Sequence, residues 1–295
     1  MSVPLSPSLA SFIGKKGSED SLTFYNRKQD NDIIVALAPG TNEDKFYHGM
    51  AESMLLSSKI ILSTENVDKK FGEALVAASL LEKPVIITDD NDIKPLLAGN
   101  VLRNYAVSSK EELLARIVEG NVLEKTNDVR VDIDHAFNVK GVGTVALGIV
   151  ISGTIKVHDS LFHSSGKQAM IRSIQSQDVD VQEAQVGTRV GLSLKGMEAD
   201  EIGKGDVFSS KKFALAKTID VNLKQSSLAN EQVAENNRYI FISNFSYAIA
   251  RVDKAGEEAR LVLEKPLSVI PGDQFLLIRE KAPRIFASGT VKAIA

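Results

Sequence analysis

Two adjacent lysines between two glycines are the residues of this 295-residue chain that most resemble a phosphate-binding loop. Gly14, Lys15, Lys16 and Gly17 are followed by Ser18. Lysine charge, together with backbone amides that glycine leaves accessible, can hold a phosphate. The order and length differ from the G-x-x-x-x-G-K-[ST] loop, which lies between a strand and a helix. Two interpretations stay open, a weak anion site or the tip of a hairpin.

A second cluster, Asp89, Asp90 and Asp92, follows an apolar run and offers oxygen ligands for a hard cation. Such a run is also typical of a turn that ends a strand and caps the next helix. The four histidines lack the paired spacing of a metal site. No nucleophile–base constellation is apparent in the sequence. We therefore predict no catalytic residue and no bound metal.

The composition indicates a globular protein. There is no cysteine, which excludes disulfide bonds, thiol catalysis and cysteine-ligated zinc. No apolar run approaches the length of a membrane span, and the N-terminus does not resemble a secretory signal, so we predict a cytoplasmic protein without a membrane partner. Only residues 212–295 carry more basic than acidic residues. That balance is compatible with a nucleic-acid contact and equally with an ordinary solvated surface.

The elements that would position these residues change in type along the chain. In the first third, apolar runs at 33–38, 59–63, 84–88 and 105–107 alternate with helical patterns, which predicts a parallel sheet covered on both faces. One predicted helix is capped by Thr41 and carries Phe46, Met50 and Met54 on one face. Helices are also predicted over 71–81 and from Ser108 to about 119. Before this unit we predict two strands, 9–13 and 22–25, joined as a hairpin through 14–20.

From about residue 129 the helical periodicity largely disappears, and short apolar runs alternate with turn signals, as in barrels or sandwiches. Residues 135–157 are typical of three strands with a glycine kink and a tight turn, and Phe137 and Val142 are among their apolar positions. A break at 209–212 separates two such units, and 121–128 is the predicted linker into the first.

The order of residues in this part resembles elongation factor Tu and its relatives among the translational GTPases, including the selenocysteine-specific factor. Residues 141–145 (GVGTV) stand where the family has G-R-G-T-V, and 152–157 resemble its next hairpin, with His158 in place of a terminal glycine. The other matching segments are 187–194, 201–207, 259–266, 271–279 and 288–291. The resemblance implies an α/β plus all-β fold, with a shortened, Rossmann-like degenerate G domain (1–128) before two elongation-factor-Tu-type β-barrels (129–211 and 212–295).

The first domain departs from the family at its nucleotide motifs. The family's D-x-P-G-H element is read here as 37–41 (LAPGT), with Leu37 at the aspartate, and its N-K-x-D element is read as 89–92 (DDND). The counterparts of a nucleotide site are then Gly14, Lys15, Lys16, Gly17 and Gly40. We expect no cofactor, because an apolar Leu37 cannot replace a carboxylate at magnesium.

The resemblance with these departures predicts a translation-factor relative that binds tRNA or a ribosome-associated partner without catalysis, and no DNA. Arg279, Lys281 and Arg284 in the last domain are the candidate RNA contacts, although basic residues at a strand edge also guard against aggregation. One alternative is a GTP-binding elongation factor that uses GTP and magnesium in a non-standard way. Another is a protein-interaction scaffold. An unrelated metabolic enzyme is the least favoured.

Overall fold

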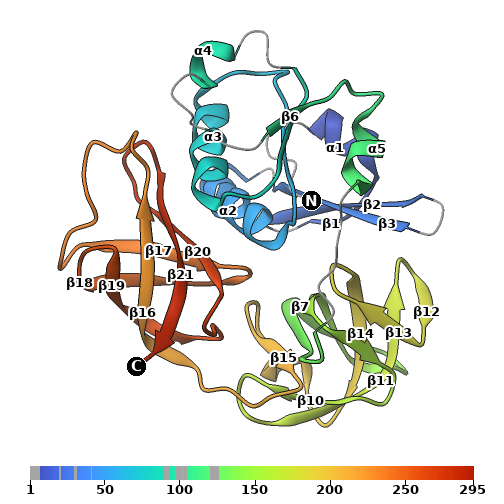
Figure 1. Ribbon diagram of the computed structural model, residues 1–295. Helices are drawn as coiled ribbons and strands as arrows, with labels where there is room; N and C mark the ends of the chain where they lie inside the picture. The colour runs from blue at the N-terminus through green and yellow to red at the C-terminus, as the bar shows by residue number, and fades with distance from the viewer. Residues whose placement is uncertain are drawn as a thin grey trace.

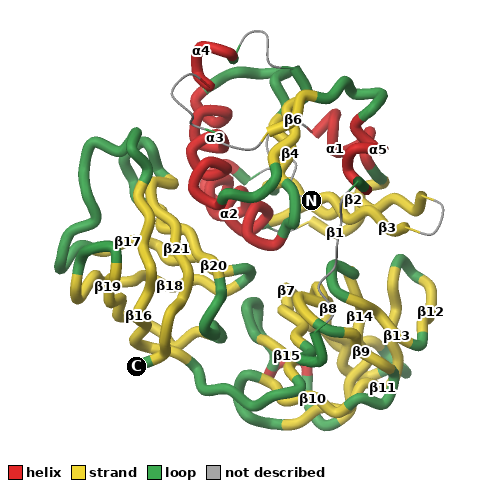
Figure 2. The backbone as a smooth tube through the Cα atoms, in the orientation of Figure 1, coloured by secondary structure: helices red, strands yellow, loops and turns green. Residues whose placement is uncertain are grey.

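The computed structural model describes residues 7–19, 21–29, 32–40, 42–89, 93–97, 102, 105–119 and 126–295. Three bodies follow one another along the chain, an α/β unit, a middle barrel and a C-terminal barrel (Figure 1). Helices lie almost entirely in the α/β unit, and the rest of the chain is built from strands (Figure 2). In the described part of the chain, no helix is long and apolar enough to cross a membrane.

The α/β unit contains two small sheets. Its elements are α1 (Pro7–Ile13), β1 (Lys15–Glu19), β2 (Leu22–Gln29), β3 (Asp32–Pro39), the short 3-10 helix η1 (Glu43–Lys45), α2 (Phe46–Leu56), β4 (Ile60–Leu62), α3 (Lys69–Leu81), β5 (Val85–Ile87), α4 (Lys94–Leu97), β6 (Tyr105–Val107) and α5 (Leu113–Val118). Strands β4, β5 and β6 are parallel, as predicted. Side chains of β4 alternate between an α2–α3 layer and an α1–α5 layer, so helices cover both faces.

The beginning of the chain corrects one prediction. Residues 9–13 belong to helix α1 and not to a strand. Leu9 and Ile13 are one helical turn apart, so both can be buried on one face of α1. Residues 14–20 were predicted as a hairpin connection, but 15–19 form β1, an edge strand paired with β2. Strand β3 pairs antiparallel with β2 and therefore lies outside the parallel set. Helix α4 was not predicted. The predicted cap Thr41 and the aspartates 90 and 92 lie outside the described residues.

The middle barrel is a closed six-stranded barrel with one added strand. Its elements are β7 (Arg130–Val139), β8 (Gly143–Ser152), β9 (Thr154–Lys156), β10 (Ser160–His163), β11 (Gln168–Ser176), β12 (Val179–Val181), β13 (Glu183–Gln185), β14 (Arg189–Lys195), the 3-10 helix η2 (Ala199–Glu201) and β15 (Val207–Ser209). The order β10-β15-β7-β8-β14-β11 closes through β10–β11. His158, at the position of the family's glycine, has a left-handed backbone with φ of 74°.

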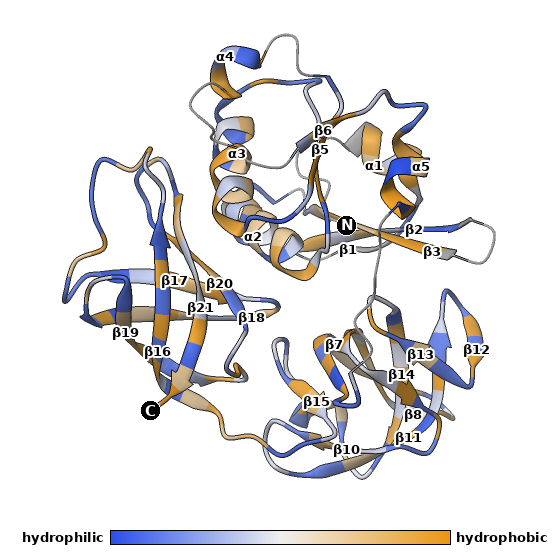
Figure 3. Ribbon diagram, in the orientation of Figure 1, coloured by the Kyte–Doolittle hydropathy of each residue, from blue (hydrophilic) through white to orange (hydrophobic). Residues whose placement is uncertain are grey.

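The C-terminal barrel is also closed and six-stranded. Its strands are β16 (Ala216–Gln225), β17 (Arg238–Ser243), β18 (Ser246–Lys254), β19 (Glu258–Leu267), β20 (Gln274–Ile278) and β21 (Ile285–Ile294), in the order β16-β19-β18-β17-β20-β21. Hydropathy alternates along many of the barrel strands (Figure 3), as expected for strands with one face in a core. The two predicted all-β units are therefore both barrels.

The α/β unit and the C-terminal barrel share a hydrophobic core. Met50 and Met54 of α2 and Phe71 of α3 belong to the same buried cluster as Ile242 and Leu276 on the outer wall of the barrel. The same two bodies are also joined by hydrogen bonds. The buried Glu73 carboxylate of α3 accepts from the backbone N–H groups of Arg284 and Ile285 in the C-terminal barrel. The helices thus pack on the barrel wall as they would inside a single domain.

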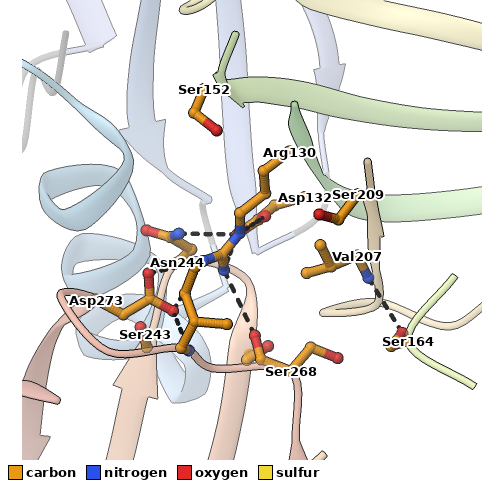
Figure 4. A network of polar contacts seen from close by, with 12 residues as sticks. Arg130, Asp132, Ser152, Ser164, Val207, Ser209, Ser243, Asn244, Ser268 and Asp273 are labelled. Carbon is orange, nitrogen blue, oxygen red and sulfur yellow. Dashed lines mark hydrogen bonds and ion pairs between the residues drawn. The ribbon is translucent and has the colours of Figure 1, made fainter. Parts of the chain in front are cut away.

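The two barrels meet through a buried charge network (Figure 4). Arg130 at the start of β7 makes an ion pair with Asp132 on its own strand and donates to both carboxylate oxygens of Asp273 in the C-terminal barrel, at 2.7 and 2.9 Å. Asn244 of the C-terminal barrel donates to Asp132 at 2.8 Å. Two carboxylates around one guanidinium satisfy most of its donors, which offsets part of the cost of burying the charges.

Candidate functional site

The outer side of β8 in the middle barrel carries an apolar stripe that is only partly covered. Ala146 and Val150 belong to the barrel core, so the alternate, odd-numbered positions of β8 face outward. The outward residues are Val145, Leu147, Ile149 and Ile151. Ile149 is buried in a cluster with Phe24 of the α/β unit and Phe245 of the C-terminal barrel. The stripe is therefore covered at one end, and Val145 and Leu147 continue it beyond the cover.

Two aromatic side chains of the neighbouring strand β7 flank the uncovered end. His135 pairs with Leu147 across the sheet, and Phe137 pairs with Val145. The two rings lie 5.6 Å apart between centroids and are tilted by 34°. Both side chains are exposed, Phe137 to 37%. We call His135, Phe137, Val145 and Leu147 the aromatic face.

The border of the aromatic face with the α/β unit is formed by a cation and an aromatic ring. Arg189 of β14 donates to Asp134 at 2.7 Å and places its guanidinium 4.0 Å from the ring centroid of Phe24 in β2. Within the described residues, one oxygen of Asp134 and one nitrogen of Arg189 are buried without a hydrogen-bond partner. A buried unpaired polar atom is costly unless a further group reaches it. This border thus places one buried acceptor and one buried donor next to the aromatic face.

Basic side chains also lie at the far end of the aromatic face. Lys140 is exposed in the turn between β7 and β8. Arg172 of β11 is exposed and reaches the same turn, with its guanidinium 3.4 Å from the carbonyl oxygen of Val142. Phe137 and Val142 were predicted as apolar strand positions, but the structure leaves Val142 exposed in this turn and Phe137 exposed on the outer side of β7.

Exposed aromatic rings bounded by cations are suited to unpaired nucleotides, because bases stack on the rings and phosphates bind the cations. The arrangement offers binding groups and no evident catalytic set. Among the described residues, no cluster of three or more histidines or carboxylates could hold a metal ion.

The structure does not bring the predicted nucleotide-binding residues together. Gly14 lies against Asn26 in β2, where an added Cβ would be 2.8 Å from the Asn26 carbonyl carbon. Gly40 lies at the other end of β2, where its N–H donates to Ser21. Ser21 and Asn26 are five positions apart, roughly 16 Å along an extended chain. Lys15, Lys16 and Gly17 belong to edge strand β1, so none of them lies in a loop that opens a helix.

The predicted RNA-binding residues lie where the C-terminal barrel meets the α/β unit. Arg279 is largely buried and lies over the ring of Phe286, with its Nε donating to the carbonyl of Pro283 at 3.0 Å. Arg284 lies over the ring of Tyr47 in α2, and the distance from its guanidinium carbon to the ring centroid is 4.8 Å. Lys281 is exposed and close to Glu231. Arg279 is thus held in a structural contact, whereas Arg284 and Lys281 are both exposed, Arg284 while also contacting Tyr47.

The aromatic face was not selected from the sequence. Period-two alternation identifies which residues share a side of a strand, but it does not say which side another domain covers. One signal was available, since His135 and Phe137 interrupt an otherwise aliphatic stretch. Adjacent exposed apolar side chains of this kind are typical of an interaction surface when they form a contiguous patch.

Comparison with known proteins agrees with the fold. Residues 143–209, which include half of the aromatic face, match the family model of elongation factor Tu domain 2. An uncharacterized protein of Methanocaldococcus jannaschii is 29% identical over 279 residues, 90% of each chain. The selenocysteine-specific elongation factor of the same organism is 37% identical over 181 residues, 52% of this chain and 39% of that factor.

Among solved structures, translation elongation factor SelB from Methanococcus maripaludis, in complex with the GTP analogue GppNHp, has a similar fold. The TM-score is 0.80 at 18% identity, over 100% of this chain and 79% of that one. The fold is thus that of an elongation factor with an α/β unit and two barrels. The chain is thus similar in fold to these elongation factors, and residues 143–209 match their second domain. The part of the chain that aligns with the selenocysteine-specific elongation factor of Methanocaldococcus jannaschii covers less than half of that factor's length.

Proposed function

We propose that this protein is a translation-factor relative that binds tRNA through the aromatic face and does so without turning over GTP. The observation that carries the proposal is the uncovered end of the β8 stripe, flanked by His135 and Phe137 and adjacent to the α/β unit. A single-stranded RNA end has unstacked bases, which suit exposed aromatic rings.

The basic residues support the same proposal. Lys140 and Arg172 lie beyond Phe137, in position for the phosphates that follow a stacked terminal base. Each stacked base contributes about 1–3 kcal/mol, and the phosphate contacts make binding dependent on salt. The protein as a whole carries a formal net charge of −3, so we expect binding to depend on this local arrangement.

The proposal that the protein works without GTP rests on two placements in the α/β unit. Lys15 and Lys16 lie in an edge strand that follows the C-terminal end of α1, so the segment that carries them does not lead into the helix N-terminus that would hold a phosphate. Leu37 is buried to 2% exposure in the cluster that joins the α/β unit to both barrels. That side chain therefore packs in a core, and no cofactor is included in the proposal.

Filter binding of tRNA to the wild-type protein and to Phe137→Ala tests the RNA part. We expect wild-type binding that weakens steeply with salt, and an affinity about tenfold lower in the variant, the loss of about one stacking contact. Val179→Ala is a matched control, because Val179 is also exposed on the middle barrel but lies on β12. Absence of binding at low salt to any tRNA, charged or uncharged, contradicts the proposal.

Equilibrium titration with fluorescent GTP and GDP in the presence of magnesium tests the other part separately. We expect no saturable signal. Saturable binding would overturn nucleotide independence and favour the alternative, a GTP-binding factor, while leaving tRNA binding to be judged by its own assay. Capture of partner proteins but no RNA in a nuclease-treated pull-down would instead favour a scaffold.

A further inference from the structure

The turn formed by residues 203–206, just before β15, touches all three bodies of the molecule. Its sequence, Gly203-Lys204-Gly205-Asp206, is in the segment that resembles the end of the second domain in the family. Two backbone hydrogen bonds fix it to β7, from Gly205 N–H to Ile133 and from Ile133 N–H to Asp206. The turn is therefore a rigid part of the middle barrel.

Lys204 connects this turn to the α/β unit. Its ammonium lies 2.8 and 3.0 Å from the two carboxylate oxygens of Glu52 in α2. The Glu52 carboxylate is fully buried and also accepts a hydrogen bond from the Ser21 hydroxyl at 2.6 Å. His48, one helical turn earlier, lies 3.3 Å away. A fully buried carboxylate needs such partners, because an unpaired charge in a protein interior is strongly destabilising.

Gly205 connects the same turn to the C-terminal barrel. It has a left-handed backbone, and a Cβ at this position would lie 2.9 Å from the carbonyl oxygen of Phe245. The Ser246 hydroxyl donates to the Gly205 carbonyl at 2.8 Å. The approach is thus so close that only glycine fits.

Asp206 stabilises the turn from within. Its carboxylate accepts from the N–H of Gly203 at 2.7 Å and from the hydroxyl of Ser164 at 3.2 Å, and it lies 3.1 Å from Nε2 of the buried His163. Burial opposes ionisation of Asp206, but these hydrogen bonds outweigh it and hold its pKa below the usual value. The charged form therefore favours the observed turn.

We infer that the 203–206 turn sets one fixed orientation of the α/β unit against the two barrels, so that the border of the aromatic face is permanently assembled and does not depend on a bound nucleotide. Rotation of the α/β unit away from the middle barrel separates Glu52 from Lys204 and exposes the apolar cluster around Ile149. Its consequence for RNA rests on the proposed function, but the orientation itself can be measured without RNA.

A distance measurement between the α/β unit and the middle barrel tests this inference. The chain has no cysteine, so the double variant Ser58→Cys with Gln182→Cys takes spin labels at these two positions and nowhere else. Both residues are exposed in the structure. Pulsed electron paramagnetic resonance of the full chain then reports the distance distribution. We expect one narrow distribution, unchanged by GDP or by a GTP analogue with magnesium. A second population, or a shift with either nucleotide, overturns the inference.

A variant identifies the part played by the turn. Lys204→Met in the labelled chain leaves Glu52 without its ammonium partner, and we expect a second, longer distance to appear. Lys167→Met is the matched control, because it removes an ion pair with Glu201 inside the same barrel and is expected to leave the distribution unchanged. If Lys204→Met alone fails to fold, the double variant Glu52→Met with Lys204→Met replaces it. A single unchanged distance in a folded Lys204 variant contradicts the role of the turn.

Discussion

The α/β unit contacts the two barrels in different ways. Against the C-terminal barrel it buries a broad apolar layer, in which α2 and α3 cover Ile242, Leu276 and Ile285. Against the middle barrel the apolar cluster is smaller, and the contact is completed by the Glu52–Lys204 ion pair and the Arg189–Phe24 stacking. The first contact resembles the core of a domain, and the second resembles a polar interface between domains.

This difference separates a structural surface from a candidate binding surface. The apolar wall of the C-terminal barrel is occupied by helices, so the basic residues around it, Arg279 and Arg284, take part in packing. The apolar stripe of the middle barrel is occupied at one end only, and its free end carries the aromatic face. A polar contact held by a few charges is also easier to disturb than an apolar layer, which the following variants exploit.

Leu276→Ala should have the largest effect on stability. Leu276 is fully buried beneath α2 and α3, and such truncations cost about 2–5 kcal/mol of unfolding free energy. Urea unfolding followed by circular dichroism gives the value. Leu228→Ala is the control, because Leu228 is 49% exposed in the same barrel and should change stability by less than about 0.5 kcal/mol. Equal effects of the two variants are incompatible with a shared core.

Lys204→Met should have the next largest effect. We expect a loss of about 1–3 kcal/mol, less than for a fully enclosed ion pair, because Lys204 is partly exposed and Ser21 and His48 still face Glu52. The double variant with Glu52→Met should recover most of this loss, since it removes the unpaired charge. A double variant as unstable as the single one would indicate that the ion pair does not determine the contact.

Asp206→Asn should lower stability by about 1 kcal/mol at pH 7, by weakening hydrogen bonds to a charged acceptor. Because the pKa of Asp206 is lowered in the folded state, the unfolded chain binds the proton more readily. The contribution is complete above the pKa of an aspartate in an unfolded chain, about 3.9, and is lost as the pH falls below it. Unfolding between pH 3 and pH 7 should therefore show a weaker acid dependence in the variant. Parallel curves for the two proteins would contradict this.

His158→Gly should have the smallest effect, and it should be stabilising. His158 is exposed and has a φ of 74°, a backbone conformation that costs a residue with a side chain about 1 kcal/mol relative to glycine. Part of that gain is offset by the greater entropy of glycine in the unfolded chain. We expect a slightly higher thermal midpoint and no change in tRNA affinity. A destabilised variant would mean that the imidazole makes a contact that compensates for the backbone.

The sequence predicted most of the elements in this fold. The helix with Met50 and Met54 on one face, the parallel strands and the all-β character of the last two units follow from periodicity, whereas the two barrels were implied by the resemblance to elongation factor Tu. The strand predicted at 9–13 was wrong because a five-residue, mostly apolar segment fits both the strand period and the helix period. Leu9 and Ile13 are buried together because they pack against the sheets of the α/β unit, which the local sequence does not show. Short apolar segments carry too few residues to separate the two patterns.

The candidate site was harder to predict, because it depends on how the bodies are placed against one another. The sequence gives no direct signal that Ile149 is covered while Phe137 is not, since both lie on outward positions of adjacent strands. The role of Lys204 likewise depends on Glu52, which is 152 residues away in the chain. Such long-range pairs are set by tertiary packing and not by local pattern.

The most direct test is a tRNA titration of the wild-type protein with and without a GTP analogue and magnesium. We predict salt-dependent binding of the same affinity in both conditions, reduced by Phe137→Ala and retained in Val179→Ala. Absence of tRNA binding at low salt, or binding that requires the nucleotide, would contradict the account.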